Sequence, residues 1–173
     1  MKGKERHTGK RNGTQGSKDR QRPAAARTER WKHKPDSHDY PAAAEYLSLV
    51  MEEALAAEVV AAMEQAPMVH RLAKDLLRAS RLPALPEDNV HVAADLAKVR
   101  AGELLSPVLL VRGDAGAGVA LTVADGYHRI CASYLLDENA PIPCHLVDPA
   151  VGPSMRDRTA GAAERQASGP ANT

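Results

Sequence analysis

The fold is decided by residues 119–136, which read VALTVADGYHRICASYLL. The apolar and β-branched residues of Val119–Ala124 predict a buried strand, and residues 126–138 predict a helix that follows it directly. Between the two lies the turn Asp125-Gly126-Tyr127-His128-Arg129. The first N–H groups of a helix lack intrahelical partners and the helix dipole is positive there, so this turn favours an anion.

Each residue of the turn suggests a separate role in holding a phosphate group. Asp125 is a favourable helix N-cap, and Gly126 allows the backbone to approach a ligand closely. Arg129 offers a planar fork of donors that suits phosphate oxygens, His128 adds a second donor, and Tyr127 could stack on a base. A purely structural interpretation stays open, in which Asp125 only caps the helix, His128 bonds a neighbouring carbonyl and Arg129 pairs with a surface carboxylate.

The segments around the turn predict a small α/β (α+β) fold. The apolar run Ser106–Arg112, the glycine-rich Gly113–Gly118 and Val119–Ala124 predict an antiparallel hairpin. With Ile142–Val147 they predict a mixed sheet of about three to four strands packed against helices. Helices are expected upstream, and their ranges are Pro41–Met51 after the possible cap Asp39, 52–65, His70–Ser80, and Val90–Arg100 terminated by Gly102. Whether the first two are separate helices is left open.

From Asn89 to Val147 the order of these features resembles the ParB/sulfiredoxin superfamily. The equivalent turn is Gly-Glu-Arg-Arg in ParB proteins, where it contacts a nucleoside triphosphate, Gly-Cys-His-Arg in sulfiredoxins, and close to Asp-Gly-His-His-Arg in free-serine kinases. The turn of this chain is nearest to the last two. The resemblance implies a nucleotide-binding domain for ATP or CTP with Mg²⁺, in which Asp125, Gly126, Tyr127, His128 and Arg129 bind the nucleotide or its phosphates.

Departures from the superfamily narrow the expected chemistry. Tyr127 stands where sulfiredoxins have their nucleophilic cysteine, so we expect no sulfinic-acid repair. The residues after Val147 do not resemble the DNA-binding part of a partitioning protein, so we expect no centromere-binding clamp. Nucleotide hydrolysis or phosphoryl transfer would need an acidic or basic group, for which the candidates are Glu87, Asp125 and His128. Whether the protein is an enzyme is left open.

Charge divides the chain into a basic tail and an acidic body. Through Lys34 there are 12 Lys and Arg against 3 Asp and Glu, net +9, whereas the remainder holds 11 against 19, net −8. We therefore expect a disordered basic tail over 1–38, one domain over 39–149 with a helical part (40–101) and a sheet with the turn (105–148), and a disordered tail over 150–173. Contact of residues 1–34 with nucleic acid would make the chain a non-enzymatic DNA-associated accessory protein, the alternative function.

The two cysteines, Cys131 and Cys144, predict no disulfide framework, and no export signal or transmembrane run is found in the sequence. We therefore expect a cytoplasmic protein without a membrane partner; its oligomeric state is left open. His128, Cys131, Cys144 and His145 are unsuited to a shared metal ion, because neighbours on a strand point to opposite faces. No metal site is expected.

Overall fold

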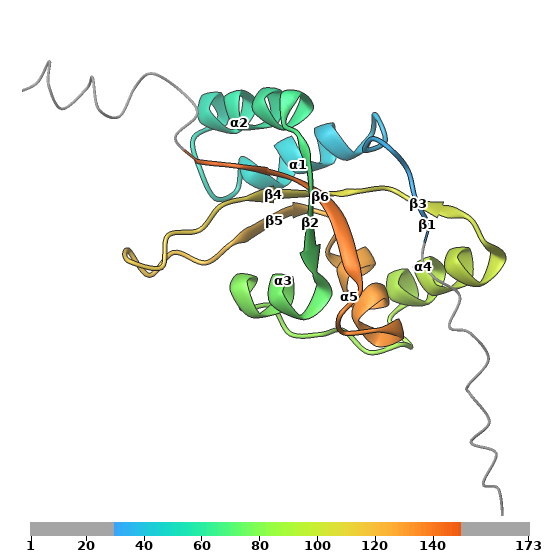
Figure 1. Ribbon diagram of the computed structural model, residues 1–173. Coiled ribbons are helices and arrows are strands. Elements are labelled where there is room, and N and C mark those ends of the chain that lie inside the picture. Colours follow the sequence, from blue (N-terminus) through green and yellow to red (C-terminus); the bar gives the residue numbers. More distant parts are fainter. Residues whose placement is uncertain (1–29, 150–173) are drawn as a thin grey trace, which may run out of the picture.

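The structure is a computed structural model that describes residues 30–149. Residues 1–29 of the tail expected over 1–38, and the whole tail expected over 150–173, lie outside this part of the chain. Within it the chain forms five helices and two small sheets, which confirms the mixed α+β class (Figure 1). The elements in chain order are β1 (Arg30–Trp31), α1 (Asp39–Leu47), α2 (Glu53–Gln65), β2 (Met68–Leu72), α3 (Ala73–Ser80), α4 (Val90–Ala101), β3 (Leu104–Leu105), β4 (Val108–Val111), β5 (Thr122–Asp125), α5 (Tyr127–Leu136) and β6 (Pro141–Val147).

The larger sheet has the strand order β2-β6-β4-β5. Strand β4 pairs antiparallel with β5 and parallel with β6, and β2 pairs antiparallel with the other edge of β6. All residues of β4 are buried, as expected for an apolar strand covered on both faces. The predicted hairpin and mixed sheet are thus confirmed, whereas β2 was not predicted.

Helices cover both faces of this sheet. Alternate residues of β4 separate the core into two layers, because successive side chains of a strand point to opposite faces. Leu109 and Val111 pack with α1 and α2, which are separate helices, and Val108 and Leu110 pack with α3, α4 and α5. Figure 1 shows α1 and α2 above the sheet and the other three helices below it.

The helix predicted over His70–Ser80 is wrong at its start. Residues Met68–Leu72 form β2, and α3 begins only at Ala73, whose N–H donates to the carbonyl of Ala140. The leucine spacing there is compatible with a helix, but the five-residue ladder between β2 and β6 supplies backbone hydrogen bonds that the sequence pattern does not reveal.

The tail boundary expected at residue 38 is also too late. Arg30–Trp31 forms a parallel pair with β3, and the N–H of Lys32 donates to the carbonyl of Leu105. Trp31, the one large apolar residue in the basic segment, packs against the core layer that contains α4 and α5. Partial burial of this side chain explains why Arg30–Trp31 joins the domain expected to begin at residue 39.

Helix α4 is capped at both ends, and its end at Gly102 is the one that the sequence predicts. Asn89 caps α4 by accepting hydrogen bonds from the N–H groups of His91 and Val92, and Gly102 ends it at φ +76°. Helix α4 packs along α5 and brings its polar face to the start of α5. In residues 30–149 there is no helix with the length and apolar character needed to cross a membrane.

Candidate functional site

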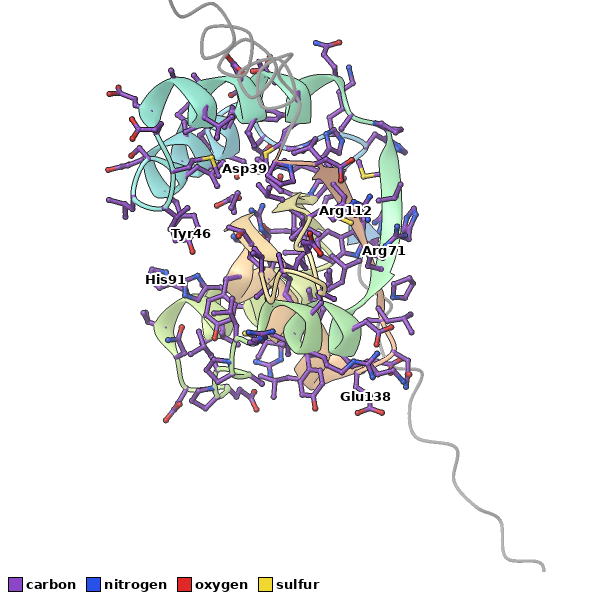
Figure 2. The ribbon with its side chains drawn as sticks, turned by 90° about the vertical axis from the view of Figure 1, so that its left-hand side faces the viewer. Asp39, Tyr46, Arg71, His91, Arg112 and Glu138 are labelled. Carbon is purple, nitrogen blue, oxygen red and sulfur yellow. The ribbon has the colours of Figure 1, made fainter. Side chains whose placement is uncertain are left out.

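The turn between β5 and α5 opens into a polar pocket of about 270 Å³. Helix α1 lines one side and helix α4 the other, and Figure 2 labels Asp39 and His91, which belong to these two walls. The titratable residues of the lining are His38, Asp39, His91, Asp95, Lys98, Asp125, His128 and Arg129, and the small ones are Ala42, Ala94 and Gly126. We call this cavity the turn pocket.

Gly126 determines how closely the turn approaches the sheet. Its φ is +99°, in the left-handed region that favours glycine. A Cβ atom here would lie 2.5 Å from Cγ1 of Val108, on the central strand. The turn therefore requires glycine for its backbone conformation and for space.

Asp125 is not the N-cap of α5, contrary to the prediction. Gly126 occupies the cap position, and no side chain accepts a hydrogen bond from the first N–H groups of the helix. The carboxylate of Asp125 pairs instead with Arg129 one turn further along. The amino end of α5 is therefore left without a side-chain cap where it faces the turn pocket.

Arg129 is held between two carboxylates. Its Nη2 donates to Asp125, and its Nη1 lies 3.3 Å from Oδ2 of Asp39. The side chains of Arg129 and Asp39 are only 12% and 5% exposed, so these ion pairs are shielded from water. Asp39 also accepts hydrogen bonds from the Ser106 hydroxyl and the Asp36 N–H. This cluster is closest to the structural interpretation of Arg129, with buried rather than surface carboxylates.

The two carboxyls have pKa values shifted in opposite directions. Burial opposes ionisation of Asp39, but the hydrogen bond from Ser106 and the charge of Arg129 outweigh it and lower its pKa. Burial raises the pKa of Asp125; Arg129 opposes this rise, while the nearby Asp39 charge adds to it. Opposite shifts in neighbouring carboxyls are a common property of acid–base sites and of structural ion pairs.

Two imidazoles lie in tilted contact at the wall of the turn pocket. The ring centroids of His91 and His128 are 4.6 Å apart. Burial lowers the pKa of His128, the neighbouring His91 lowers it further, and Asp95 opposes the shift. Asp95 itself pairs with Lys98 at 2.9 Å. At neutral pH the pocket therefore holds His128 mainly as the neutral imidazole.

Two predicted site residues lie elsewhere. Tyr127 does not line the turn pocket; its hydroxyl donates to the carbonyl of Pro83 and its ring packs against the core. Glu87 is an exposed loop residue that pairs with Arg100 at 2.7 Å and is absent from the pocket lining. The structure brings Asp125, Gly126, His128 and Arg129 together and leaves Tyr127 and Glu87 out.

Several pocket residues were missed by sequence reasoning. The sequence predicts Asp39 only as a possible cap, but it is the first residue of α1 and its carboxylate points to Arg129. His91, Asp95 and Lys98 recur every three or four residues, a spacing that puts them on one face of α4. This polar stripe is a signal that could have found them. No local pattern marks Ser106.

Cysteine and metal chemistry receive no support from the geometry of residues 30–149. Burial raises the pKa of the Cys131 thiol, whose sulfur accepts a hydrogen bond from the N–H of Leu85. In this part of the chain no group of three or more His, Cys, Asp and Glu side chains is arranged to hold a metal ion. Oδ2 of Asp39 and Oδ2 of Asp125 pair with Arg129, so we expect Mg²⁺ to enter with phosphate oxygens as its main ligands.

The fold and the site together define a small mixed α+β protein with a histidine-rich polar pocket at a strand–turn–helix junction. Comparisons of the chain with protein-family models, with curated proteins and with solved structures found no match.

Proposed function

We propose that the turn pocket binds the phosphate groups of a nucleotide, and that the chain is a nucleotide-binding domain of the ParB/sulfiredoxin-like kind. One observation supports this most: the amino end of α5, which has no side-chain cap, faces a pocket lined by three imidazoles and Lys98. Free N–H groups and the helix dipole both favour an anion at such a position. A cytoplasmic location is part of the proposal, because the free thiols Cys131 and Cys144 persist in reducing compartments.

The proposed roles differ from those expected from the sequence. Backbone N–H groups at the start of α5 and the imidazoles of His91 and His128 would donate to phosphate oxygens. Arg129 would act through its buried ion pairs, which hold the turn in shape, and through its charge. A volume of about 270 Å³ suits a polyphosphate better than a whole nucleotide, so the base would lie at the pocket mouth.

The charge of the pocket makes binding depend on the histidines. With all imidazoles neutral, Lys98 and Arg129 oppose Asp39, Asp95 and Asp125, giving a formal net charge of −1. Protonation of the three pocket histidines changes this to +2. Mg²⁺ carried by ATP or CTP would also make the net charge of the pocket more positive.

Replacing His128 or His91 by alanine is expected to weaken binding of ATP or CTP with Mg²⁺ by about tenfold, because each variant removes one donor from the phosphate site. Isothermal calorimetry on the full chain measures this, with ADP for comparison. His70→Ala is the matched control, since His70 is an exposed residue of β2 outside the pocket. Absence of nucleotide binding by the parent protein, or equal losses in His70→Ala, would rule out the proposed site.

Anion affinity of the turn pocket is expected to rise as the pH is lowered from about 8 to about 5.5. Since the pKa of His128 is lowered in the free protein, the imidazole is neutral at the upper pH and must take up a proton to form a charged donor. Protonation of Asp125, whose pKa is raised, acts in the same direction. Sulfate serves as the probe because its charge is constant over this range. The dependence should be flatter in His128→Ala, and affinity that falls on acidification would contradict the assignment.

Phosphoryl transfer or nucleotide hydrolysis is a second candidate, favoured by the opposite pKa shifts of Asp39 and Asp125 beside the proposed phosphate site. Phosphorus NMR of the same nucleotide samples would detect turnover.

The DNA-associated alternative depends on residues 1–34, most of which lie outside the described part of the chain, and it stays a prediction.

A further inference from the structure

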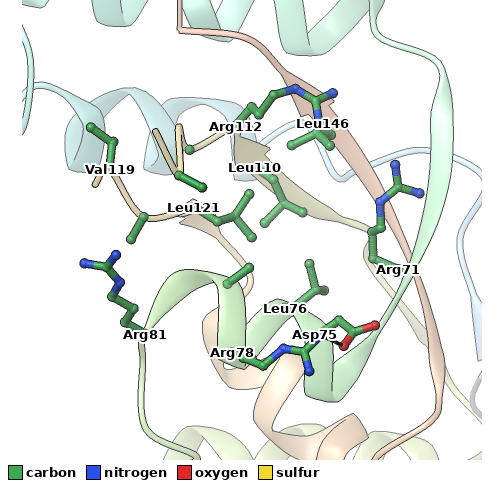
Figure 3. Close-up of a pocket in the computed structure, with 14 residues that line it drawn as sticks. Arg71, Asp75, Leu76, Arg78, Arg81, Leu110, Arg112, Val119, Leu121 and Leu146 are labelled. Atoms are coloured by element: carbon green, nitrogen blue, oxygen red, sulfur yellow. Dashed lines mark hydrogen bonds and ion pairs between the residues drawn. The ribbon is translucent and has the colours of Figure 1, made fainter. Parts of the chain in front are cut away.

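A second and larger cavity, of about 460 Å³, has no lining residue in common with the turn pocket. It is bounded by α3, by the residues between β4 and β5, and by β2 and β6. Figure 3 shows arginine side chains arranged around it and leucine side chains at its centre. We call it the arginine cavity.

The floor of the arginine cavity is apolar. Leu76 comes from α3, Leu110 and Leu146 from adjacent strands, and Leu121 from the segment that leads into β5. The wall beside Leu121 is joined to α3, because the N–H of Leu121 donates to the carbonyl of Ala79 at 3.0 Å. At the neck of the hairpin, a Cβ on Gly113 would lie 2.5 Å from the backbone of Val119 and Ala120, so the two chain segments are in close contact there. The cavity thus has a well-defined apolar base.

The rim has an excess of positive charge in a domain whose net charge is negative. Four arginines line the cavity against a single carboxylate, Asp75, whereas residues 30–149 as a whole hold 11 Lys and Arg against 17 Asp and Glu, net −6. Arg78 pairs with Asp75 and Arg112 with Asp148, both near the surface. Arg71 donates to the carbonyl of His70. A local excess of positive charge over an apolar base favours an anion that also has an apolar part.

Arg81 gives a second, independent indication that the arginine cavity is a ligand site. It is the C-cap of α3 and has φ +60°, and it is the only residue other than glycine with positive φ in the described part of the chain. Glycine is the usual residue at such a position, because a side chain there is strained. Within residues 30–149 the guanidinium of Arg81 makes no ion pair that would account for this strained backbone. The residue also lines the arginine cavity. Strained residues that lack a structural partner are often found at ligand sites.

We propose that the arginine cavity binds a small organic anion, with its apolar body on the leucine floor and its carboxylate or phosphate group between the arginines. The volume lies within the range of about 300–1,000 Å³ that is usual for small-molecule sites. The chain's own segments outside the described part have unsuitable charge, since residues 1–29 are net +6 and residues 150–173 net +1. The proposal is independent of the function proposed for the turn pocket.

The test measures binding of 1-naphthoate and 1-naphthyl phosphate to the full chain by calorimetry, and follows the leucine methyl groups by NMR. We expect shifts at Leu121 and Leu146 with at least one of the two probes. Arg81→Gly is expected to lower the affinity for that probe by about fivefold. The double variant Arg81→Gly/Arg71→Gln is expected to lower it by more than about tenfold. Arg81→Gly should fold normally because glycine suits the left-handed backbone at this position.

Two control variants distinguish binding in the arginine cavity from nonspecific charge attraction and from binding in the turn pocket. Arg100→Gln, which removes an arginine remote from the cavity, and His128→Ala should leave the leucine shifts and the affinity that accompanies them unchanged. The proposal is overturned if neither probe shifts the leucine methyl groups, or if the arginine variants bind as tightly as the parent. It is equally overturned if neutral 1-naphthalenemethanol or inorganic phosphate alone binds there as tightly as the probes.

Discussion

Replacing Arg129 by alanine is expected to lower the free energy of unfolding by about 3 kcal/mol at neutral pH, because it leaves two buried carboxylates without their shared cation. The side chains of Asp39 and Asp125 are 5% and 23% exposed, so water cannot fully replace the guanidinium. Denaturant unfolding followed by circular dichroism measures the change.

The size of this loss should depend on pH. The charge of Arg129 lowers the pKa of both carboxyls, so its removal raises both folded-state values. A carboxyl whose folded-state pKa lies above its unfolded value penalises folding at high pH, and the penalty disappears as the pH falls through the folded-state pKa. The difference between variant and parent should therefore be largest near pH 7 and shrink toward about pH 4.

A matched control uses an exposed ion pair. Arg78 pairs with Asp75 at 2.9 Å, but its side chain is 83% exposed, so Arg78→Ala should change stability by at most about 0.5 kcal/mol. An equally small effect for Arg129→Ala would show that the Asp39–Arg129–Asp125 cluster contributes little to the fold. Because the variant affects folding, loss of nucleotide binding in Arg129→Ala cannot by itself identify a phosphate ligand, and the histidine variants are the better test.

Replacing Gly126 by alanine is expected to destabilise the protein by about 3 kcal/mol or more. Two effects add: an L-residue is strained at φ +99°, and the new Cβ would lie 2.5 Å from Cγ1 and 2.9 Å from Cβ of Val108. The turn would have to move away from β4, which would also open the turn pocket. Thermal and denaturant unfolding measure the loss, and a phosphate titration of the surviving folded protein measures its effect on the pocket.

The variant Gly102→Ala separates the backbone strain of a positive φ from the contact of the new Cβ with Val108. Gly102 has φ +76°, but a Cβ there would meet nothing within 4 Å, so only the backbone strain of about 1 kcal/mol is expected. Relief of crowding by Val108→Ala in the Gly126→Ala background should recover part of the stability lost at position 126. Equal losses for Gly126→Ala and Gly102→Ala would mean that contact with Val108 is unimportant.

The strand–turn–helix segment was predictable because its signals are local. A β-branched apolar run followed by Asp125-Gly126 and a helix-forming segment describes β5 and α5 within a few residues. The hairpin of β4 and β5, the cap Asn89 and the C-cap Gly102 were predictable for the same reason. Strand β2 was not, because its conformation is determined by pairing with β6, more than sixty residues further along the chain.

The candidate site likewise combines residues that local sequence signals predict with residues that only distant contacts bring in. Its sequence signal lay in the turn, which contributes Asp125, Gly126, His128 and Arg129 to the lining of the turn pocket. In the structure Asp125 pairs with Arg129 instead of capping α5, and Arg129 also pairs with a carboxylate from α1 instead of forming an open phosphate fork. Asp39 is 90 residues away from Arg129 in the chain, and no local pattern predicts that pair.

The sequence by itself determined the mixed α+β class, the hairpin and the strand–turn–helix junction, because these depend on apolar periodicity and turn chemistry within short segments. The tertiary structure alone decided which side chains meet. It joined α1 and α5 through a buried ion cluster, placed the polar face of α4 opposite the turn, and gathered four arginines around an apolar cavity. These arrangements arise from packing between segments distant in sequence, where contact geometry rather than local propensity determines the outcome.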